Sequence, residues 1–340
     1  MIARTRACRG LLISVAAAAV LSAIGASPAA AEDKKVIGWS VAYFDHPVYQ
    51  LMMQAAQKLA DKSDCKVVFA DGKNDPSVQA SQVDNFIAQK VDGILLTPTV
   101  SDPLIPAVKK INRANIPLVM VDRRMESHGQ PLKWDALVSW DMVKSGTIGG
   151  EQVVSALNGK GNIVVVEGTP GAGSTIDRGN AFYKVVAQHP DIKILAKIPA
   201  DFNRAKGQEV TENILRRFKP GQIDAIYYMA DEMLFGGLQA IKAANRLHEF
   251  KIVSVDGEKE ALDMLRAGDF DYDAEFHPDD QAVAVPILCD ILHGRKPDLA
   301  HQTYEGRKMD LVEFEGEPWV RPTVYPIDKS NADLPENKGW

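Results

Sequence analysis

The sequence predicts an α/β protein with two doubly wound lobes. Short apolar runs alternate with amphipathic segments along nearly the whole chain, and the alternation pauses around residues 133–141 and then restarts. A repeated strand–helix unit requires a parallel sheet that is covered by helices on both faces. Because the rhythm occurs twice, we expect two such sheets in succession.

The first half contains four apolar runs that are short enough to be buried strands. The segments between them carry apolar residues at three- and four-residue spacing, which is typical of helices. The predicted strands are residues 35–41, 66–70, 92–98 and 116–122, and the predicted helices are residues 47–63, 75–90 and 101–114.

The second half begins with a helix over residues 142–157 and repeats the pattern. Its predicted strands are residues 162–168, 192–200, 224–231 and 250–257, and its predicted helices are residues 174–188, 204–218 and 232–245. A short extended piece, residues 271–276, precedes a last helix over residues 278–294. If that helix returns to the first lobe, the chain crosses between the lobes several times, as in a hinge. The expected lobes are then residues 32–137 with 277–303 and residues 138–276 with 304–325, followed by a polar tail, 326–340.

The first 31 residues have the features of a secretory signal peptide. Three arginines and no acid precede an apolar stretch, and small residues follow at Ala29 and Ala31. This order predicts cleavage after Ala31. The apolar run is slightly short for a membrane anchor. We therefore expect an exported, soluble protein in the periplasm.

Charge and cysteine content narrow the function further. Cleavage removes three arginines and no acid, so the formal charge falls from −6 to −9. An acidic chain without clustered Lys and Arg is a poor candidate for binding nucleic acid. Cys65 and Cys289 remain, and they form either a disulfide or two buried thiols. The histidines show no HExxH motif and the cysteines no CxxC motif, so no metal site is predicted.

A glycine-rich stretch, residues 162–175, resembles a phosphate-binding loop but lacks its essential lysine. Position 174 is Ser, and Pro170 removes a backbone N–H that a phosphate would need. Other residues that follow strands are aromatics, carboxylates and arginines. Because ligands of open α/β sheets bind at the carboxyl ends of the strands, this mixture favours a small neutral ligand with several hydroxyls. No arrangement of residues specifically indicates catalysis, and we expect no cofactor.

Seven segments resemble the ribose-binding branch of periplasmic sugar-binding proteins, the receptors of ABC importers. They include IGWSVAYFDHPVYQLMMQAAQKLA, IPLVMVDRR and EGTPGAGSTIDRGNAF, and the similarity runs from residue 35 to about residue 295. The resemblance implies two Rossmann-like lobes joined by a multi-strand hinge, a ligand enclosed in the cleft between them, and no enzymatic activity.

The resemblance also implies a set of sugar contacts. The matching positions are Ser40, Tyr49, Asp122, Arg123, Arg178, Phe202, Asp231 and Asp256, and a further contact position carries His46 where an asparagine is common. Some of them have purely structural alternatives. His46 could be a turn residue, Arg178 a surface residue of its helix, Phe202 a loop-packing ring, and Asp256 a helix cap.

Two further positions depart from the family pattern. Ala230 stands where an asparagine is common, and Phe276 stands where a glutamine is common. An unpaired buried hydroxyl costs about 1–3 kcal/mol, so ribose itself should fit poorly. The departures favour a deoxy sugar or a polyol, and the acids Asp45 and Glu275 leave room for an amino-substituted polyol.

The expected function is that of a monomeric solute-binding protein. It would enclose one sugar or polyol, deliver it to an ABC transporter permease, and meet the membrane only through that permease. The alternative is a periplasmic sensor that presents its closed form to a chemoreceptor or a histidine kinase. A sugar-responsive repressor shares the fold but would need an amino-terminal helix-turn-helix in place of the signal peptide.

Overall fold

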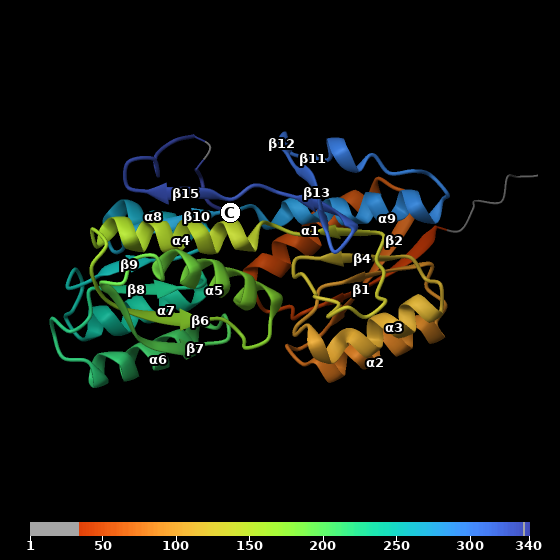
Figure 1. Ribbon diagram of the computed structural model, residues 1–340. Helices are drawn as coiled ribbons and strands as arrows, with labels where there is room; N and C mark the ends of the chain where they lie inside the picture. The colour runs from red at the N-terminus through yellow and green to blue at the C-terminus, as the bar shows by residue number, and fades with distance from the viewer. Residues whose placement is uncertain (1–33, 336) are drawn as a thin grey trace, which may run out of the picture. The chain divides into compact units, whose positions relative to one another are not determined.

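Two mostly parallel sheets organise the chain, as the alternation of strands and helices predicts (Figure 1). The computed structural model describes residues 34–335 and 337–340. The predicted signal peptide, residues 1–31, lies outside the described residues. Among those that are described, no helix combines the length and the apolar character needed to cross a membrane.

The first sheet has seven strands in the order β13-β14-β5-β4-β3-β1-β2. Neighbouring strands are parallel except β13, which pairs antiparallel with β14. The strands are β1 (Lys35–Val41), β2 (Cys65–Asp71), β3 (Gly93–Leu96), β4 (Leu118–Val121), β5 (Ala136–Val138), β13 (Asp310–Phe314) and β14 (Glu317–Arg321).

The second sheet has six strands in the order β15-β10-β9-β8-β6-β7. All neighbours are parallel except β15, which pairs antiparallel with β10. The strands are β6 (Gly161–Glu167), β7 (Ile192–Pro199), β8 (Ala225–Tyr228), β9 (Lys251–Val253), β10 (Tyr272–Glu275) and β15 (Tyr325–Asp328). A separate short hairpin joins β11 (Thr303–Tyr304) to β12 (Arg307–Lys308).

Helices cover both faces of each sheet. Figure 1 shows α1 and α9 on one face of the first sheet and α2 and α3 on the other, while around the second sheet α4 packs on α5 and α6 packs on α7. The helices are α1 (Pro47–Asp61), α2 (Pro76–Ala88), α3 (Ile105–Arg113), α4 (Met142–Ala156), α5 (Gly173–Val186), α6 (Arg204–Arg217), α7 (Asp231–Ala243), α8 (Lys259–Ala267) and α9 (Ala284–Leu292), with 3₁₀ turns η1 (Asp102–Leu104), η2 (Pro278–Val283) and η3 (Leu299–His301).

The chain passes between the two lobes at three places. These connections join β5 to α4, β10 to η2, and β14 to β15. They lie close to the carboxyl ends of β5 and β10, so residues next to them can contact both lobes.

Two of the expected lobe boundaries are wrong. Residues 310–321 belong to the first sheet rather than the second lobe, because β14 pairs with β5 and buries Trp319 and Val320. The expected polar tail, residues 326–340, begins inside the second lobe, since β15 completes the second sheet and Ile327 is buried in its core.

Cys65 and Cys289 form a disulfide that joins β2 to α9 within the first lobe. The sequence leaves open whether these cysteines form a disulfide or two buried thiols, and the structure shows the disulfide. The two cysteines are 224 residues apart, so the bond closes a long loop in the unfolded chain. A crosslink of this kind stabilises the folded state chiefly by restricting the unfolded one.

Reduction of this disulfide should therefore lower the free energy of unfolding by about 2–5 kcal/mol. The measurement is thermal unfolding of the protein with and without reductant, beside a Cys65→Ser/Cys289→Ser double variant. The variant should match the reduced protein and should not respond to reductant. Equal melting temperatures for all samples would contradict the prediction.

Candidate functional site

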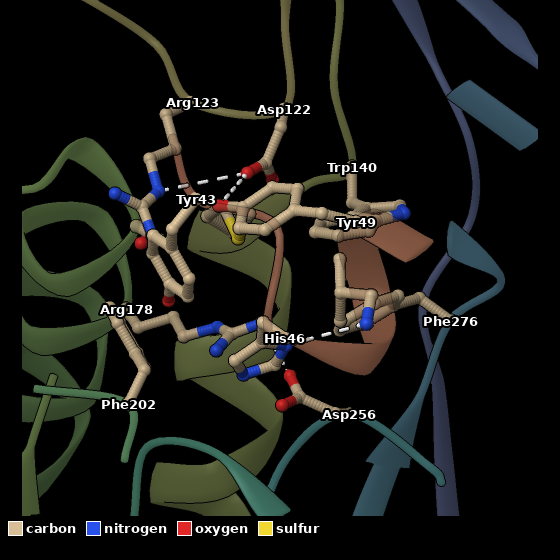
Figure 2. Close-up of a pocket in the computed structure, with 13 residues that line it drawn as sticks. Tyr43, His46, Tyr49, Asp122, Arg123, Trp140, Arg178, Phe202, Asp256 and Phe276 are labelled. Carbon is tan, nitrogen blue, oxygen red and sulfur yellow. Dashed lines mark hydrogen bonds and ion pairs between the residues drawn. The ribbon is translucent and has the colours of Figure 1, made fainter. Parts of the chain in front are cut away.

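One cavity lies where the carboxyl ends of strands from both sheets meet (Figure 2). The open volume of this cavity is about 30 Å³, well below the usual range for ligand sites, so the lining side chains nearly fill it in this structure. Most of its lining residues follow β1, β4, β5, β7, β9 and β10, as expected for open α/β sheets. They are Tyr43, His46, Val48, Tyr49, Asp122, Arg123, Trp140, Met142, Ser174, Arg178, Phe202, Asp256 and Phe276.

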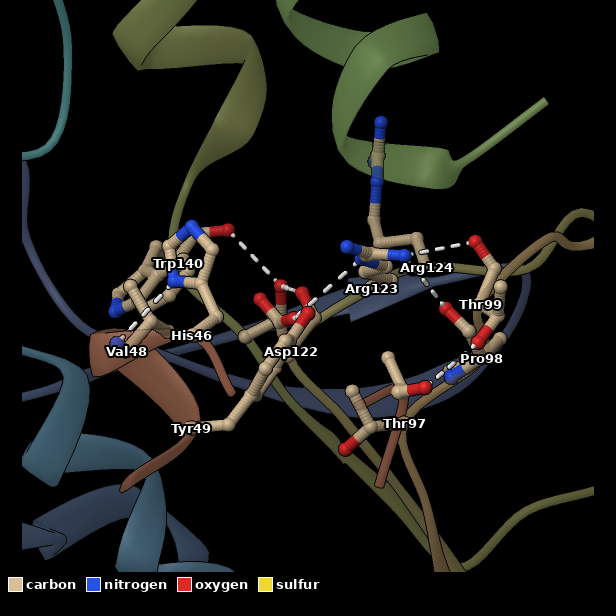
Figure 3. A network of polar contacts seen from close by, with 12 residues as sticks. His46, Val48, Tyr49, Thr97, Pro98, Thr99, Asp122, Arg123, Arg124 and Trp140 are labelled. Carbon is tan, nitrogen blue, oxygen red and sulfur yellow. Dashed lines mark hydrogen bonds and ion pairs between the residues drawn. The ribbon is translucent and has the colours of Figure 1, made fainter. Parts of the chain in front are cut away.

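The first lobe contributes a buried acid–base pair directly after β4. The Tyr49 hydroxyl donates to Asp122 Oδ2 at 2.8 Å, and Arg123 Nε lies 3.6 Å from the same oxygen. Arg123 also donates to the carbonyl oxygens of Thr99 at 2.7 Å and Pro98 at 3.3 Å (Figure 3). Backbone carbonyls from the turn after β3 thus hold the guanidinium in place.

His46 is both a turn residue and a lining residue. It caps α1 by accepting the N–H of Val48 on Nδ1 at 3.3 Å, and Pro47 starts the helix. Burial, together with the positive charges of Arg123 and Arg178, lowers the pKa of His46 to about 3. The imidazole is therefore neutral, and since Nδ1 accepts, Nε2 carries the proton and can donate to a ligand.

The second lobe contributes a matching pair, Arg178 on α5 and Asp256 after β9. Arg178 Nη2 donates to Asp256 Oδ1 at 2.9 Å, and Nη1 donates to the carbonyl of Met229 at 2.6 Å. A third bond joins Nε to Ser145 Oγ at 3.2 Å. The glycine-rich stretch thus leads into a helix that presents a guanidinium, as the sequence predicts, and not a phosphate-binding lysine.

Aromatic rings form much of the remaining wall. The rings of Trp140 and Phe276 lie 3.7 Å apart between centroids. The Phe202 ring lies 5.6 Å from the Arg123 guanidinium carbon. It sits so close to Gly168 that a Cβ there would be 1.9 Å from it, so this position requires glycine. Burial raises the pKa of Tyr43 to about 12, which keeps its hydroxyl protonated.

Two polar atoms in the wall are buried without a hydrogen-bond partner in the described structure. They are Asp122 Oδ1 and Ser174 Oγ, one from each lobe. Unpaired buried polar atoms are costly, and their presence in the wall of a cavity indicates groups that a ligand would satisfy. An acceptor and a hydroxyl at these positions suit a ligand that carries hydroxyl groups.

Contacts between the lobes border the cavity. Arg124, which follows Arg123, donates from Nε to Asp177 Oδ2 of α5 at 2.7 Å. The backbone N–H of Ser101 donates to the carbonyl of Gly171 at 3.2 Å. These bonds join residues after β3 and β4 of the first lobe to the loop and helix that carry Arg178.

The cavity brings together eight of the eleven residues named from the sequence and leaves out Ser40, Ala230 and Asp231. Ser40 lies inside the first lobe, where its hydroxyl donates to Gln82 and accepts from Gln79, both on α2. Ala230 is buried at the start of α7. The Asp231 carboxylate is held by Ser254 and by the Glu258 N–H, so it supports the site from behind.

Five lining residues were not named from the sequence: Tyr43, Val48, Trp140, Met142 and Ser174. Tyr43 and Ser174 lie in segments that follow predicted strands. Treating every residue of those segments as a candidate site residue would have included both. Trp140 lies at a lobe connection that no strand–helix pattern marks, and Met142 is the first residue of the helix that follows it. The acids Asp45 and Glu275 do not line this cavity, so they give no support for an amino-substituted ligand.

Across residues 34–335 and 337–340, the grouping of side chains that could ligate a metal is Cys65, Cys289 and His293. Two of these side chains form the disulfide. The cavity itself contains carboxylates and guanidinium groups in pairs, an arrangement that suits hydroxyl recognition rather than metal binding.

Two doubly wound lobes that enclose a small polar and aromatic cavity define a two-lobed ligand-binding protein. Residues 37–296 match the family model described as "Periplasmic binding protein domain". The chain therefore belongs to this family, and its relatives place it with the ribose-binding type.

Relatives and solved structures support this assignment. The chain is 32% identical over 274 residues to the ribose import binding protein RbsB of Bacillus subtilis, covering 80% of this chain and 87% of that one. It is 35% identical over 251 residues to the xylitol-binding protein of Mycolicibacterium smegmatis, covering 74% and 70%. An ABC transporter solute binding protein from Bacillus halodurans with bound myo-inositol has a TM-score of 0.77, 25% identity and coverage of 90% and 98%. These relatives are binding proteins, which confirms the prediction that the chain is not an enzyme.

Asp256 belongs to a cluster of four buried carboxyl groups in the second lobe. Burial raises the pKa of Asp256 to about 7, of Asp273 to about 8 and of Glu258 to about 9, and it raises that of Asp231 well above the usual range. Neighbouring acids add to each of the last three shifts. The folded protein thus keeps protons that the unfolded chain releases above about pH 4.

The stability that these protonated groups contribute should therefore be fully present below about pH 4 and should be lost as the pH rises from there to about 9. Melting temperatures across pH 5–9 measure this. Asp273→Asn, which removes a buried ionisable group whose Oδ2 has no partner, should make the fall shallower. Asp333→Asn, at an exposed carboxylate, is the matched control and should follow the parent protein. A melting temperature that rises from pH 6 to 9 would contradict the prediction.

Proposed function

We propose that this protein binds one small sugar or polyol in the cavity between its lobes. The observation that carries the proposal is the pairing of Asp122 with Arg123 and of Asp256 with Arg178 around two unpartnered polar atoms. Carboxylates and guanidinium groups bind adjacent hydroxyls in pairs, and aromatic faces cover the C–H surface of a ring. The ligands in the relatives' names, ribose, xylitol and myo-inositol, are all small polyhydroxyl compounds.

Phe276 favours a ligand with fewer hydroxyls than ribose, or with hydroxyls placed differently. Its ring is buried against Trp140 and offers no hydrogen bond where the family commonly has an amide. Ala230 adds nothing to this argument, because it does not reach the cavity. A deoxy sugar or a polyol therefore fits the cavity better than ribose.

The proposed role is delivery of this ligand to the permease of an ABC importer, after export to the periplasm as a monomer. A ligand that contacts both lobes favours the closed form, and hinge closure of this kind is a general mechanism for periplasmic binding proteins. Uptake of the bound compound by cells that lack the protein tests the role. Lost uptake supports transport, whereas normal uptake with a lost transcriptional or chemotactic response would favour the sensor alternative.

The ligand class is tested by thermal shift and calorimetry with D-ribose, L-arabinose, D-fucose, xylitol and myo-inositol. At 100 times its dissociation constant, a bound compound should stabilise the protein by about 2.7 kcal/mol. Arg178→Ala and Asp256→Asn should each weaken the binding at least tenfold. Each removes one partner of a buried charged pair.

Arg216→Ala is the matched control, because Arg216 is an exposed residue of α6 that lies away from the cavity. It should leave the affinity unchanged. If no compound in the panel binds, or if Arg178→Ala binds as tightly as Arg216→Ala, this cavity is not a sugar or polyol site.

A further inference from the structure

Residues 337–340 pack against the part of the second lobe that carries Asp256 and Phe276. Trp340 Nε1 donates to the carbonyl oxygen of Asp256 at 2.9 Å, and its ring stacks on Phe276 with centroids 6.2 Å apart. The end of the chain accordingly lies beside β10 in Figure 1. Trp340 therefore contacts two cavity residues and is not itself a lining residue.

The Asp256 backbone needs this support because its conformation is unfavourable. Its φ angle is +140°, in a region that residues with a side chain rarely adopt. Such conformations persist only where the surroundings hold them in place. The carbonyl oxygen of Asp256 accepts two hydrogen bonds, from the Phe276 N–H at 3.2 Å and from Trp340 Nε1. Trp340 thus supplies one of the two bonds that fix the peptide after Asp256.

The segment is itself held at several points. The Gly339 N–H donates to Glu275 Oε1 at 3.2 Å, and the Lys259 N–H donates to the Trp340 carbonyl at 3.1 Å. A Cβ on Gly339 would lie 2.6 Å from Lys259 Cα, so only glycine allows this approach. Arg266 donates to the carbonyl of Asn337 at 2.9 Å. Little conformational freedom remains, so the indole can act as a fixed support.

We propose that Trp340 is a positioning residue for ligand binding, which acts through the Asp256 carbonyl and the Phe276 ring. This inference rests on the proposed function, because it concerns the same cavity. The indole holds the Asp256 carboxylate in reach of Arg178 and holds the Phe276 ring against Trp140. Without the indole N–H, the Asp256 peptide and the Phe276 ring would be less ordered before the ligand binds. Ordering them on binding costs free energy, so the affinity for the ligand would fall.

The test is Trp340→Phe, which keeps an aromatic ring against Phe276 and removes the N–H donor. Calorimetry with D-ribose, L-arabinose, D-fucose, xylitol and myo-inositol should show about a five- to thirtyfold weaker affinity for whichever of them binds the parent protein. Hydrogen exchange of the ligand-free protein should be faster at the amide of Phe276. Trp134→Phe is the matched control, since Trp134 is buried in the first lobe and its Nε1 has no partner there.

The outcomes separate the two proposals. If no compound binds the parent protein, the proposed ligand class fails, while the exchange measurement still tests whether Trp340 fixes this edge of the cavity. If Trp340→Phe matches Trp134→Phe in both affinity and exchange, the positioning role is wrong. Should Trp340→Phe fail to fold, Gly339→Ala, which displaces the segment without altering Trp340, should give the same loss of affinity and the same faster exchange. Parent-like values for that variant would overturn the inference.

Discussion

The burial of two guanidinium groups beside two carboxylates is the interaction on which the rest of the site depends. Removing charges from water is costly unless each one is paired and its remaining hydrogen-bonding groups are satisfied. The protein meets this requirement with backbone carbonyls, those of Thr99 and Pro98 for Arg123 and that of Met229 for Arg178. Because these carbonyls follow strands of two different sheets, the positions of the charged groups are coupled to the positions of the sheets.

The same requirement explains why the two halves of the cavity differ. The first-lobe pair is surrounded by rings, with Tyr43, Tyr49 and Phe202 all within 6 Å of the Arg123 guanidinium carbon. In the second-lobe pair Arg178 faces Asp256, whose carboxyl group adds to the effect of burial in raising the pKa of the acids Asp231, Glu258 and Asp273. The first half therefore offers a fixed charge among rings, and the second half offers carboxyl groups whose charge depends on pH.

Much of the fold follows from local patterns in the sequence, and the errors concern contacts between distant residues. Alternating apolar runs and amphipathic segments identify the strands and helices as far as α9, apart from β5, because each pattern is local. The pairing of Trp319 with Leu137 joins residues 182 positions apart, and no local periodicity reveals such a partner. The same limit applies to Trp340 and its contacts with Asp256 and Phe276.

At the site, the rule that ligands bind at the carboxyl ends of strands selects the residues of both acid–base pairs, and the structure places them in the wall of one cavity. It fails for Ser40 because a residue near a strand end can face either side of the sheet, and this one faces α2. It also fails for Asp231, whose carboxylate is used within its own lobe by Ser254. Distinguishing a residue in the wall of a cavity from one behind it requires the direction of the side chain, which position along the chain does not give.

The disulfide has a topological consequence for the second lobe. Cys65 and Cys289 lie in the first lobe, and nearly all of the second lobe, apart from β15, lies between them in the chain. If the second lobe unfolds while the first stays folded, it remains a covalently closed loop whose two ends are held near their native positions. Fixed loop ends reduce the entropy that unfolding can gain, so such a tethered lobe begins refolding from ends that are already in place.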